Sequence, residues 1–378
     1  MRIYKVGGAV RDTLLGLEPT DNDWVVVGST PKEMLSMGYK QVGKDFPVFL
    51  HPDTNEEYAL ARKERSTGPG HTAFNFNFSP NVTLEEDLGR RDITINAIAM
   101  DDTGNLIDPF HGVRDLENRM IKHISDAFIE DPLRVLRVAR LYTKLHEFNF
   151  VIAETTQVLL DQLFPSLKHL PGERIWQETE KVLHMENPTP YFELIHHYFF
   201  QRDESRAISS YFKPFGLTFN GVITSSYNIE LNPGLKTPES WWAIIGKEFK
   251  ERAFLDYANE RLKVPKSYKK MSELVFDFRE KYFSKYNELN FENKVKNLYK
   301  CLERIQPSKN LEFATSVAFL AAHNYLGGDM QLWVPFLKAY SEILPTDEEK
   351  KLDGSKIQEI LKERKIRLIE EAIKGNYY

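Results

Sequence analysis

The stretch Gly7-Gly8-Ala9-Val10-Arg11-Asp12 follows a short apolar run at Ile3–Val6, and Asp21-Asn22-Asp23 opens a second apolar run at Trp24–Val27. Alternate residues of a strand point to one face, so the two aspartates of the second stretch can share one metal site. A glycine pair lets backbone amides approach a triphosphate closely. Together the two stretches predict a mixed α/β domain with a metal-dependent nucleotidyl transfer site.

The paired carboxylates are the candidate catalytic and metal-binding residues. Nucleotidyl transfer needs two divalent cations to align the attacking hydroxyl, the α-phosphate and the leaving pyrophosphate. Magnesium prefers oxygen ligands, which Asp21 and Asp23 provide. Gly8 and Arg11 form the candidate phosphate cradle. Taken separately, each motif has a structural alternative. Asp21 and Asp23 could be two acids beside a turn, and the glycine pair with Arg11 could be a strand-to-helix turn with a surface arginine.

A second charged motif, Arg90-Arg91-Asp92-x-x-x-Asn96, also fits a nucleotide. Arginine forms bidentate contacts with phosphate, and a carboxylate or an amide can bind ribose hydroxyls. The alternative is a charged helix end whose acid neutralises its neighbours.

A third motif lies on a helix predicted over Asp126–His146, with Ser125 as its N-cap. Asp131 and Arg134 are three residues apart, so they are predicted to lie side by side. The aspartate can only accept hydrogen bonds and the arginine can only donate them. Facing a base edge, such a pair admits cytosine and adenine and rejects uracil and guanine, which present a carbonyl and a ring N–H. The alternative is a helical salt bridge worth about 0.3–0.5 kcal/mol.

Composition limits the class of protein. The chain has 378 residues, 42% of them hydrophobic, which is enough for two or three folded domains. A net charge of −5 argues against a protein that coats nucleic acid indiscriminately, but it leaves room for a local basic groove. The single cysteine, Cys301, excludes an internal disulfide and fits a reducing cytosol. No apolar run is long enough to cross a bilayer, so we expect a cytoplasmic protein without a membrane partner.

The periodicity of the chain changes once. Residues up to about 110 predict short strands with few helices, and the pattern is helical from about residue 113 onward. Residues 64–82 are rich in Ser, Thr, Gly, Pro and Asn and predict a long loop. Residues 205–235 lack a clear period and predict a link between two helical regions.

The motifs occur in an order that resembles a known family, the bacterial tRNA nucleotidyltransferases that add CCA, of the class (class II) shared with bacterial poly(A) polymerases. The resemblance extends over about 200 residues. Within it, Asp23–Gly28 and Gly43–Pro52 are similar to the enterobacterial type. The motifs that carry the resemblance are Gly7–Asp12, Asp21–Val26, Arg90–Asn96, Asp108–Gly112, Glu130–Arg140 and Gly172–Arg174.

The resemblance implies an α+β protein with a polymerase-β-like nucleotidyltransferase head followed by an all-helical neck, body and tail. The implied ranges are residues 1–112 for the catalytic head, 113–204 for the neck with the base-reading helix, and 205–378 for the tRNA-binding body and tail. It also implies that Asp21 and Asp23 hold Mg²⁺ and that Asp131 and Arg134 serve as a protein template. The residues implied to bind ATP or CTP are Gly8, Arg11, Arg91, Arg137 and Arg140.

The implied reaction is addition of C, C and A to the 3′ end of tRNA from CTP and ATP, with release of pyrophosphate and no role for DNA. Many relatives of the enterobacterial type carry a C-terminal His-Asp phosphohydrolase domain, but the corresponding region here reads Trp241–Lys247 and lacks its metal ligands. A poly(A) polymerase and a partial enzyme that adds only CC or only A share these motifs. A non-catalytic RNA-binding module is disfavoured, because both Asp21 and Asp23 are present.

Overall fold

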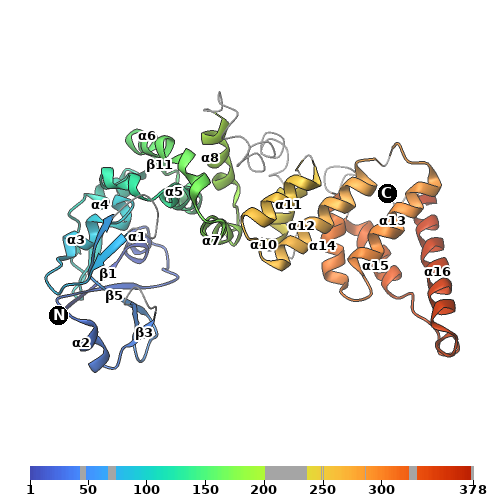
Figure 1. Cartoon of the computed structure of the whole chain (residues 1–378), viewed down its shortest axis with the longest axis horizontal. Helices are drawn as coiled ribbons and strands as arrows, with labels where there is room; N and C mark the ends of the chain where they lie inside the picture. Colours follow the sequence, from blue (N-terminus) through green and yellow to red (C-terminus); the bar gives the residue numbers. More distant parts are fainter. Residues whose placement is uncertain are drawn as a thin grey trace. The chain divides into compact units, whose positions relative to one another are not determined.

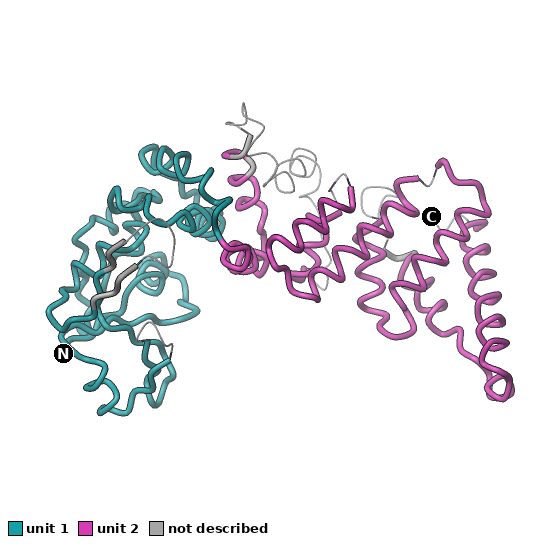
Figure 2. The backbone as a smooth tube through the Cα atoms, viewed as in Figure 1, with its two compact units in different colours: residues 1–170 teal, residues 171–378 magenta. Residues whose placement is uncertain are grey.

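The computed structural model describes the chain except for residues 43–47, 67–73, 201–235, 248, 250, 286, 323–329 and 376–378. The chain forms two compact units, residues 1–170 and residues 171–378 (Figure 2). The first is a mixed sheet-and-helix unit and the second is helical, which confirms the α+β class. The predicted link at 205–235 lies outside the described residues, and the three-part division into head, neck and tail stays a prediction.

Unit 1 is built on a seven-stranded sheet in the order β3-β4-β5-β2-β1-β8-β9 (Figure 1). Neighbouring strands pair antiparallel except β2 and β5, which are parallel. Two small sheets, β6–β7 and β10–β11, accompany it. The strands are β1 (Arg2–Val6), β2 (Asp23–Val27), β3 (Lys40–Val42), β4 (Val48–Leu50), β5 (Glu57–Leu60), β6 (Lys63–Ser66), β7 (Phe74–Asn77), β8 (Ala99–Met100), β9 (Leu106–Ile107), β10 (Met120–Ile121) and β11 (Val151–Ile152).

Strand β2 separates two hydrophobic cores because its side chains alternate between the faces of the sheet. Val25 and Val27 pack with Val6 on one face. Val26 packs on the other face with Met34, together with the partly buried Trp24. Asp23 therefore shares the face of Val25, whereas Trp24 lies behind it.

The helices of unit 1 are short except for one of 13 residues, α5. Helix α2 begins after Thr30, whose side chain forms a capping box with Glu33. The helices are α1 (Gly8–Leu14), α2 (Pro31–Ser36), α3 (Leu84–Gly89), η1 (Thr94–Asn96), α4 (Gly112–Glu117), η2 (Asp126–Glu130), α5 (Leu133–Leu145), η3 (His146–Phe148), α6 (Glu154–Leu163) and η4 (Phe164–His169).

Two local predictions for unit 1 were wrong. The helix expected over Asp126–His146 is divided, because Asp131 is extended (φ −123°, ψ 107°) and α5 begins only after Pro132. A residue before proline is driven out of the helical region, which explains the break. The loop expected at 64–82 contains the antiparallel strands β6 and β7, and residues 67–73 between them lie outside the described residues.

Unit 2 is helical throughout its described residues. Helix α10 packs against α7, α12 and α14, and its residues Ser240–Lys247 are all buried. Helix α7 approaches α11 closely, since a Cβ at Gly172 would overlap the carbonyl oxygen of Arg261. The helices are α7 (Gly172–Leu183), α8 (Thr189–Phe200), α10 (Pro238–Lys247), α11 (Arg252–Arg261), α12 (Lys266–Phe278), η6 (Arg279–Phe283, a π-helix), α13 (Phe291–Ile305), α14 (Leu311–Ala322), α15 (Met330–Ser341), η7 (Glu349–Lys351) and α16 (Gly354–Lys374).

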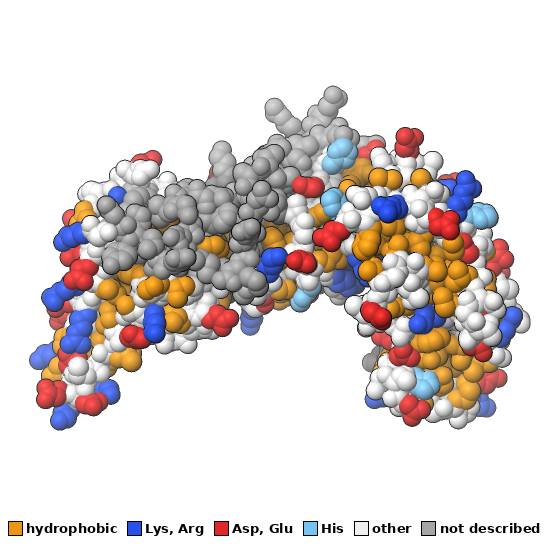
Figure 3. Space-filling model, turned by 180° about the vertical axis from the view of Figure 1, so that it is seen from behind, with side chains coloured by type: hydrophobic (Ala, Val, Ile, Leu, Met, Phe, Trp, Pro, Cys, Tyr) orange, Lys and Arg blue, Asp and Glu red, His pale blue; other side chains and the backbone are white. Residues whose placement is uncertain are grey.

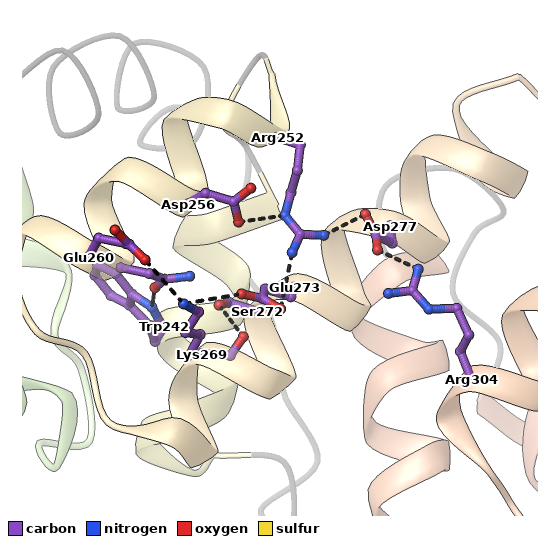
Figure 4. A network of polar contacts seen from close by, with 10 residues as sticks. Trp242, Arg252, Asp256, Glu260, Lys269, Ser272, Glu273, Asp277 and Arg304 are labelled. Atoms are coloured by element: carbon purple, nitrogen blue, oxygen red, sulfur yellow. Dashed lines mark hydrogen bonds and ion pairs between the residues drawn. The ribbon is translucent and has the colours of Figure 1, made fainter.

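An ion-pair network joins α11, α12 and α13 (Figure 4). The Arg252 guanidinium pairs with Asp256 at 2.8 Å, with Glu273 at 3.0 Å and with Asp277 at 2.7 Å. Asp277 also pairs with Arg304 of α13. One arginine therefore connects two helices, and an aspartate extends the connection to the third.

Helix α16 carries charges of both signs, and blue and red side chains are interspersed over its end of unit 2 (Figure 3). Its first turn is capped by Asp353, whose carboxylate accepts a hydrogen bond from the Ser355 amide at 3.1 Å. Lys365 pairs with Glu303 at 2.7 Å and lies over the Tyr340 ring. None of the helices in the described ranges has the length and apolar content needed to cross a bilayer.

Candidate active site

The register of the central sheet places the glycine turn beside the aspartates. Val6, the last residue of β1, pairs with Asp23, the first residue of β2, so Gly7 lies next to the start of β2. Gly7 has φ +72° and donates its N–H to the Ile98 carbonyl oxygen at 3.3 Å. A Cβ at this position would lie 2.8 Å from Nη1 of Arg91. Only glycine combines this backbone conformation with so close an arginine.

A cavity of about 410 Å³ opens at this end of the sheet in unit 1. Its walls come from the glycine turn and α1, from the start of β2, from the segment after α3, and from one face of α5. The predicted site residues on its walls are Gly8, Arg11, Asp21, Asp23, Arg91, Arg137 and Arg140. Asp131 and Arg134 are not among its lining residues.

Arg11 is fixed by the buried Asp12 and the half-buried Asn96. Its Nη1 donates to Oδ1 of Asn96 at 2.6 Å, and its Nε and Nη2 donate to Oδ1 of Asp12 at 2.9 and 2.7 Å. The second oxygen of Asp12 accepts from Nζ of Lys144, on α5, at 2.8 Å. Neither Asp12 nor Lys144 was predicted as a site residue, because no sequence spacing links residues so far apart.

The arginine pair at the end of α3 is held by one buried aspartate. Asp87 accepts from Nε of Arg90 at 2.9 Å and pairs with Nη2 of Arg91 at 3.4 Å. Burial favours the neutral carboxyl, but the two guanidinium groups outweigh it and keep the pKa of Asp87 below its ordinary value. Asp87 was also missed, although its spacing of three and four residues from the two arginines is a signal for contact on a helix.

Asp92 connects the arginine motif to α5. Its Oδ2 accepts from Nε of Arg137 at 2.7 Å, and its Oδ1 accepts from the Ile93 amide at 3.1 Å. Burial alone would raise the pKa of this carboxyl, but the charge and hydrogen bond of Arg137, the charge of Arg134 and a backbone amide together lower it to about 2. Asp92 is thus an ion-pair partner of α5, and both of its oxygens are engaged.

Asp21 and Asp23 are exposed at the cavity. Loss of surrounding solvent raises the pKa of Asp23, Arg91 opposes this shift, and the like charge of Asp21 adds to it. A divalent cation would relieve this repulsion. The parallel pairing of β2 with β5 sets Glu57 opposite Asp23, a neighbour that sequence alone cannot reveal. In the described parts of the chain, no group of three or more His, Cys, Asp or Glu side chains could hold a metal ion. The pair Asp21 and Asp23 therefore remains the candidate metal site.

The expected template residues have other partners in this structure. Oδ1 of Asp131 accepts from the Leu133 amide at 3.0 Å, at the start of α5. The Arg134 guanidinium donates from Nη1 to the Ala127 carbonyl oxygen and from Nη2 to the Arg90 carbonyl oxygen, both at 3.1 Å. The two residues lie close along the chain, but Asp131 precedes the helix, so they do not share a helical face as expected.

The chain is similar to known proteins over parts of its length. Residues 3–122 match the family described as Poly A polymerase head domain, and residues 149–199 match the family described as Probable RNA and SrmB- binding site of polymerase A. A curated CCA-adding enzyme from Actinobacillus succinogenes is 59% identical over 197 residues, which are 52% of this chain and 49% of the relative. The chain thus spans about half the length of that curated relative.

Solved structures of CCA-adding enzymes share the fold over nearly the whole chain. The apo form II of one such enzyme has a TM-score of 0.65 at 23% identity, covering 98% of this chain and 88% of its own. The Bacillus stearothermophilus enzyme in complex with CTP has a TM-score of 0.64 at 24% identity, covering 99% and 89%. The Thermotoga maritima enzyme complexed with tRNA has a TM-score of 0.61 at 22% identity, covering 99% and 91%. The chain is therefore similar to the Poly A polymerase head domain over residues 3–122 and to a CCA-adding enzyme over about half of its length.

Proposed function

We propose that this protein adds C, C and A to the 3′ end of tRNA, using CTP and ATP and releasing pyrophosphate. One observation carries the proposal: a single cavity joins two exposed carboxylates, Asp21 and Asp23, to a set of arginines that includes Arg11 and Arg91. Carboxylates for a metal and guanidinium groups for a triphosphate are the parts that nucleotidyl transfer needs. The CCA-adding enzymes that match this chain support tRNA as the acceptor.

Asp21 and Asp23 are the residues we propose to hold Mg²⁺. Their carboxylate oxygens are the ligands that magnesium prefers, and both side chains line the same cavity. When bound, a pair of such ions supplies positive charge at the attacking hydroxyl, the α-phosphate and the leaving pyrophosphate. The two-metal form of the reaction belongs to this proposal.

Arginines from separate segments of the cavity wall are proposed to bind the triphosphate. Arg91 and Arg11 are oriented by Asp87, Asp12 and Asn96, so little side-chain entropy is lost when a nucleotide binds. Arg137 and Arg140 reach the same cavity from α5. Gly8 lines it as well, where the absence of a side chain leaves room for a phosphate.

Asp131 and Arg134 are proposed to read the base through the donor–acceptor pattern that cytosine and adenine share. Both residues must first exchange partners, because Arg134 Nη2 is bound to the Arg90 carbonyl oxygen and Asp131 caps α5. The carbonyl that Arg134 would release belongs to the residue beside Arg91. Base reading and phosphate binding are therefore coupled through adjacent residues in this proposal.

We further propose a head at residues 1–112, a base-reading neck at 113–204 and a tRNA-binding body and tail at 205–378, working in the cytoplasm. The composition supports this location, since the single cysteine, Cys301, is buried and unable to form an internal disulfide.

The test is incorporation of labelled CTP and ATP by the purified chain into tRNAs that end before CCA, after C and after CC. We expect stepwise C, C and A addition, and loss of both activities in Asp23→Ala with tRNA affinity retained. Addition of C alone or A alone would identify a partial enzyme, and long adenylate tails on unrelated RNA would identify a poly(A) polymerase. Full C and A addition by Asp23→Ala would refute the site.

A further inference from the structure

The carboxylate of Glu56 accepts hydrogen bonds from both chain neighbours of Asp23, which are Asn22 and Trp24. Glu56, which directly precedes β5, accepts from Nδ2 of Asn22 at 2.7 Å through Oε1. Its Oε2 accepts from Nε1 of Trp24 at 3.2 Å and from Oγ1 of Thr54 at 3.2 Å. Glu56 is thus joined to both chain neighbours of an aspartate that lines the cavity.

These contacts lie behind the cavity. Trp24 points to the face of the sheet opposite Asp23, where it stacks on Tyr58 with ring centroids 5.5 Å apart. Nζ of Lys5 lies 5.6 Å from the Trp24 ring centre. Asn22, Trp24 and Glu56 are absent from the cavity walls, whereas Asp21 and Asp23 line them.

The hydrogen bonds that Glu56 accepts require its carboxyl group to be ionised. Hydrogen bonding from Asn22, with smaller contributions from Thr54 and Trp24, holds the pKa of Glu56 below its ordinary value despite partial desolvation. An ionised carboxylate only accepts, and both Nδ2 of Asn22 and Nε1 of Trp24 only donate, so every contact is matched. Charge-assisted hydrogen bonds of this kind are shorter and stronger than neutral ones.

We propose that Glu56 is a positioning residue for the metal-binding pair: it fixes Asn22 and Trp24 and thereby holds the Asp21 and Asp23 carboxylates at the spacing one metal site needs. The inference rests on the metal-binding role given to this pair in the proposed function. Two carboxylates separated by one residue bind a cation well only if the backbone between them is rigid. Asn22 is that intervening residue, and Glu56 holds it from the neighbouring strand.

The test uses the full-length chain with its tryptophans labelled with ¹⁵N, which gives five indole signals. Trp24→Phe identifies the Trp24 signal and removes one donor to Glu56. Bound Mn²⁺ broadens signals near it, so titration with Mn²⁺ in the presence of a non-hydrolysable CTP analogue measures the Kd at the carboxylate pair without any turnover. The variants are Glu56→Ala, Glu56→Gln and the matched control Thr54→Ala, which keeps the contacts to Asn22 and Trp24.

We expect Glu56→Ala to shift the Trp24 signal and to raise the Mn²⁺ Kd by about tenfold, the size of effect seen for residues that orient metal ligands. Glu56→Gln keeps one acceptor for Asn22 and is expected to lie between Glu56→Ala and wild type, while Thr54→Ala stays at the wild-type Kd. In the CTP addition assay, kcat should fall and be restored in part by more Mg²⁺. KM for CTP should stay nearly unchanged, because Arg11 and Arg91 have their own partners.

A shifted Trp24 signal with an unchanged Mn²⁺ Kd in Glu56→Ala would overturn the inference, as would a Trp24 signal that does not respond to the loss of Glu56. If Glu56→Ala does not fold, Glu56→Gln decides by the same two readings. A wild-type chain that adds no nucleotide to tRNA, but whose Mn²⁺ Kd still depends on Glu56, would refute the proposed function and leave the positioning role standing. Failure of Mn²⁺ to broaden Trp24 in the wild type would refute the metal site and this inference together.

Discussion

Replacing Gly7 by alanine is expected to damage the active site through Arg91 rather than through stability. An alanine at φ +72° and ψ −134° occupies a backbone region almost restricted to glycine, at a cost of about 1–3 kcal/mol. The added Cβ would lie 2.8 Å from Nη1 of Arg91, and the contact becomes ordinary only at 3.4 Å, so the guanidinium must move by 3.4 − 2.8 = 0.6 Å. It cannot move without loosening its bonds to Asp87 and to the Asn96 carbonyl. Since a displacement of about 1 Å at a catalytic group costs about 100-fold in rate, we expect kcat/KM for CTP to fall by about 10- to 100-fold.

The matched control is Gly16→Ala. Gly16 has φ +73°, nearly that of Gly7, but nothing lies within 4 Å of the position its Cβ would take. Both variants place a side chain at positive φ, a cost that urea unfolding measures for each, and only Gly7→Ala should lose single-turnover CTP addition. In the background of Arg91→Ala, the Gly7 substitution should add little, because its effect passes through the same side chain. Equal activity of the two glycine variants, or full additivity with Arg91→Ala, would refute the reasoning.

Three further outcomes follow from the site. The pKa of Asp92 falls from 3.8 in the unfolded chain to about 2 in the folded protein, which contributes about 2.4 kcal/mol of stability. This contribution is present above pH 4 and is lost as the pH falls through 2. Asp92→Asn should therefore lower the urea-unfolding free energy by about 2 kcal/mol at pH 7 and by clearly less at pH 3. Asp131→Ala should reduce discrimination against UTP and GTP by about 1–3 kcal/mol in kcat/KM measured for all four nucleotides, and unchanged selectivity would leave the residue only its capping role. Removing Lys144 should lower CTP addition by releasing Asp12 and hence Arg11, whereas Lys122→Ala, on the segment before η2, should match wild type in the same assay.

Local signals in the sequence predicted much of unit 1. The strand before Gly7 and the strand after Asp21 are confirmed, because each depends on residues adjacent in the chain. Periodicity alone mispredicted the helix over Asp126–His146, because the apolar pattern continues across Pro132, where the helix is interrupted.

The arrangement of the candidate site was less accessible. The glycine and aspartate motifs predict the candidate site residues, but the partners that orient these residues come from distant segments. Lys144 reaches Asp12 across 132 residues, and Glu56 reaches Asn22 across 34. Such pairs depend on sheet register and on the rotation of α5, which the spacing of residues along one chain does not specify.

Gly172 limits how the gene for this protein can change. Every single-base substitution that alters a glycine codon either introduces a larger side chain or ends translation, and here any side chain would collide with the main-chain oxygen of Arg261. Relaxing that overlap would require one of two helices to shift, disturbing the aromatic contacts of Trp176 with Trp242 and Tyr268. Mutational drift at this codon should therefore be slow even where the surrounding helices diverge freely. The residue offers a fixed reference point for aligning distant sequences to unit 2.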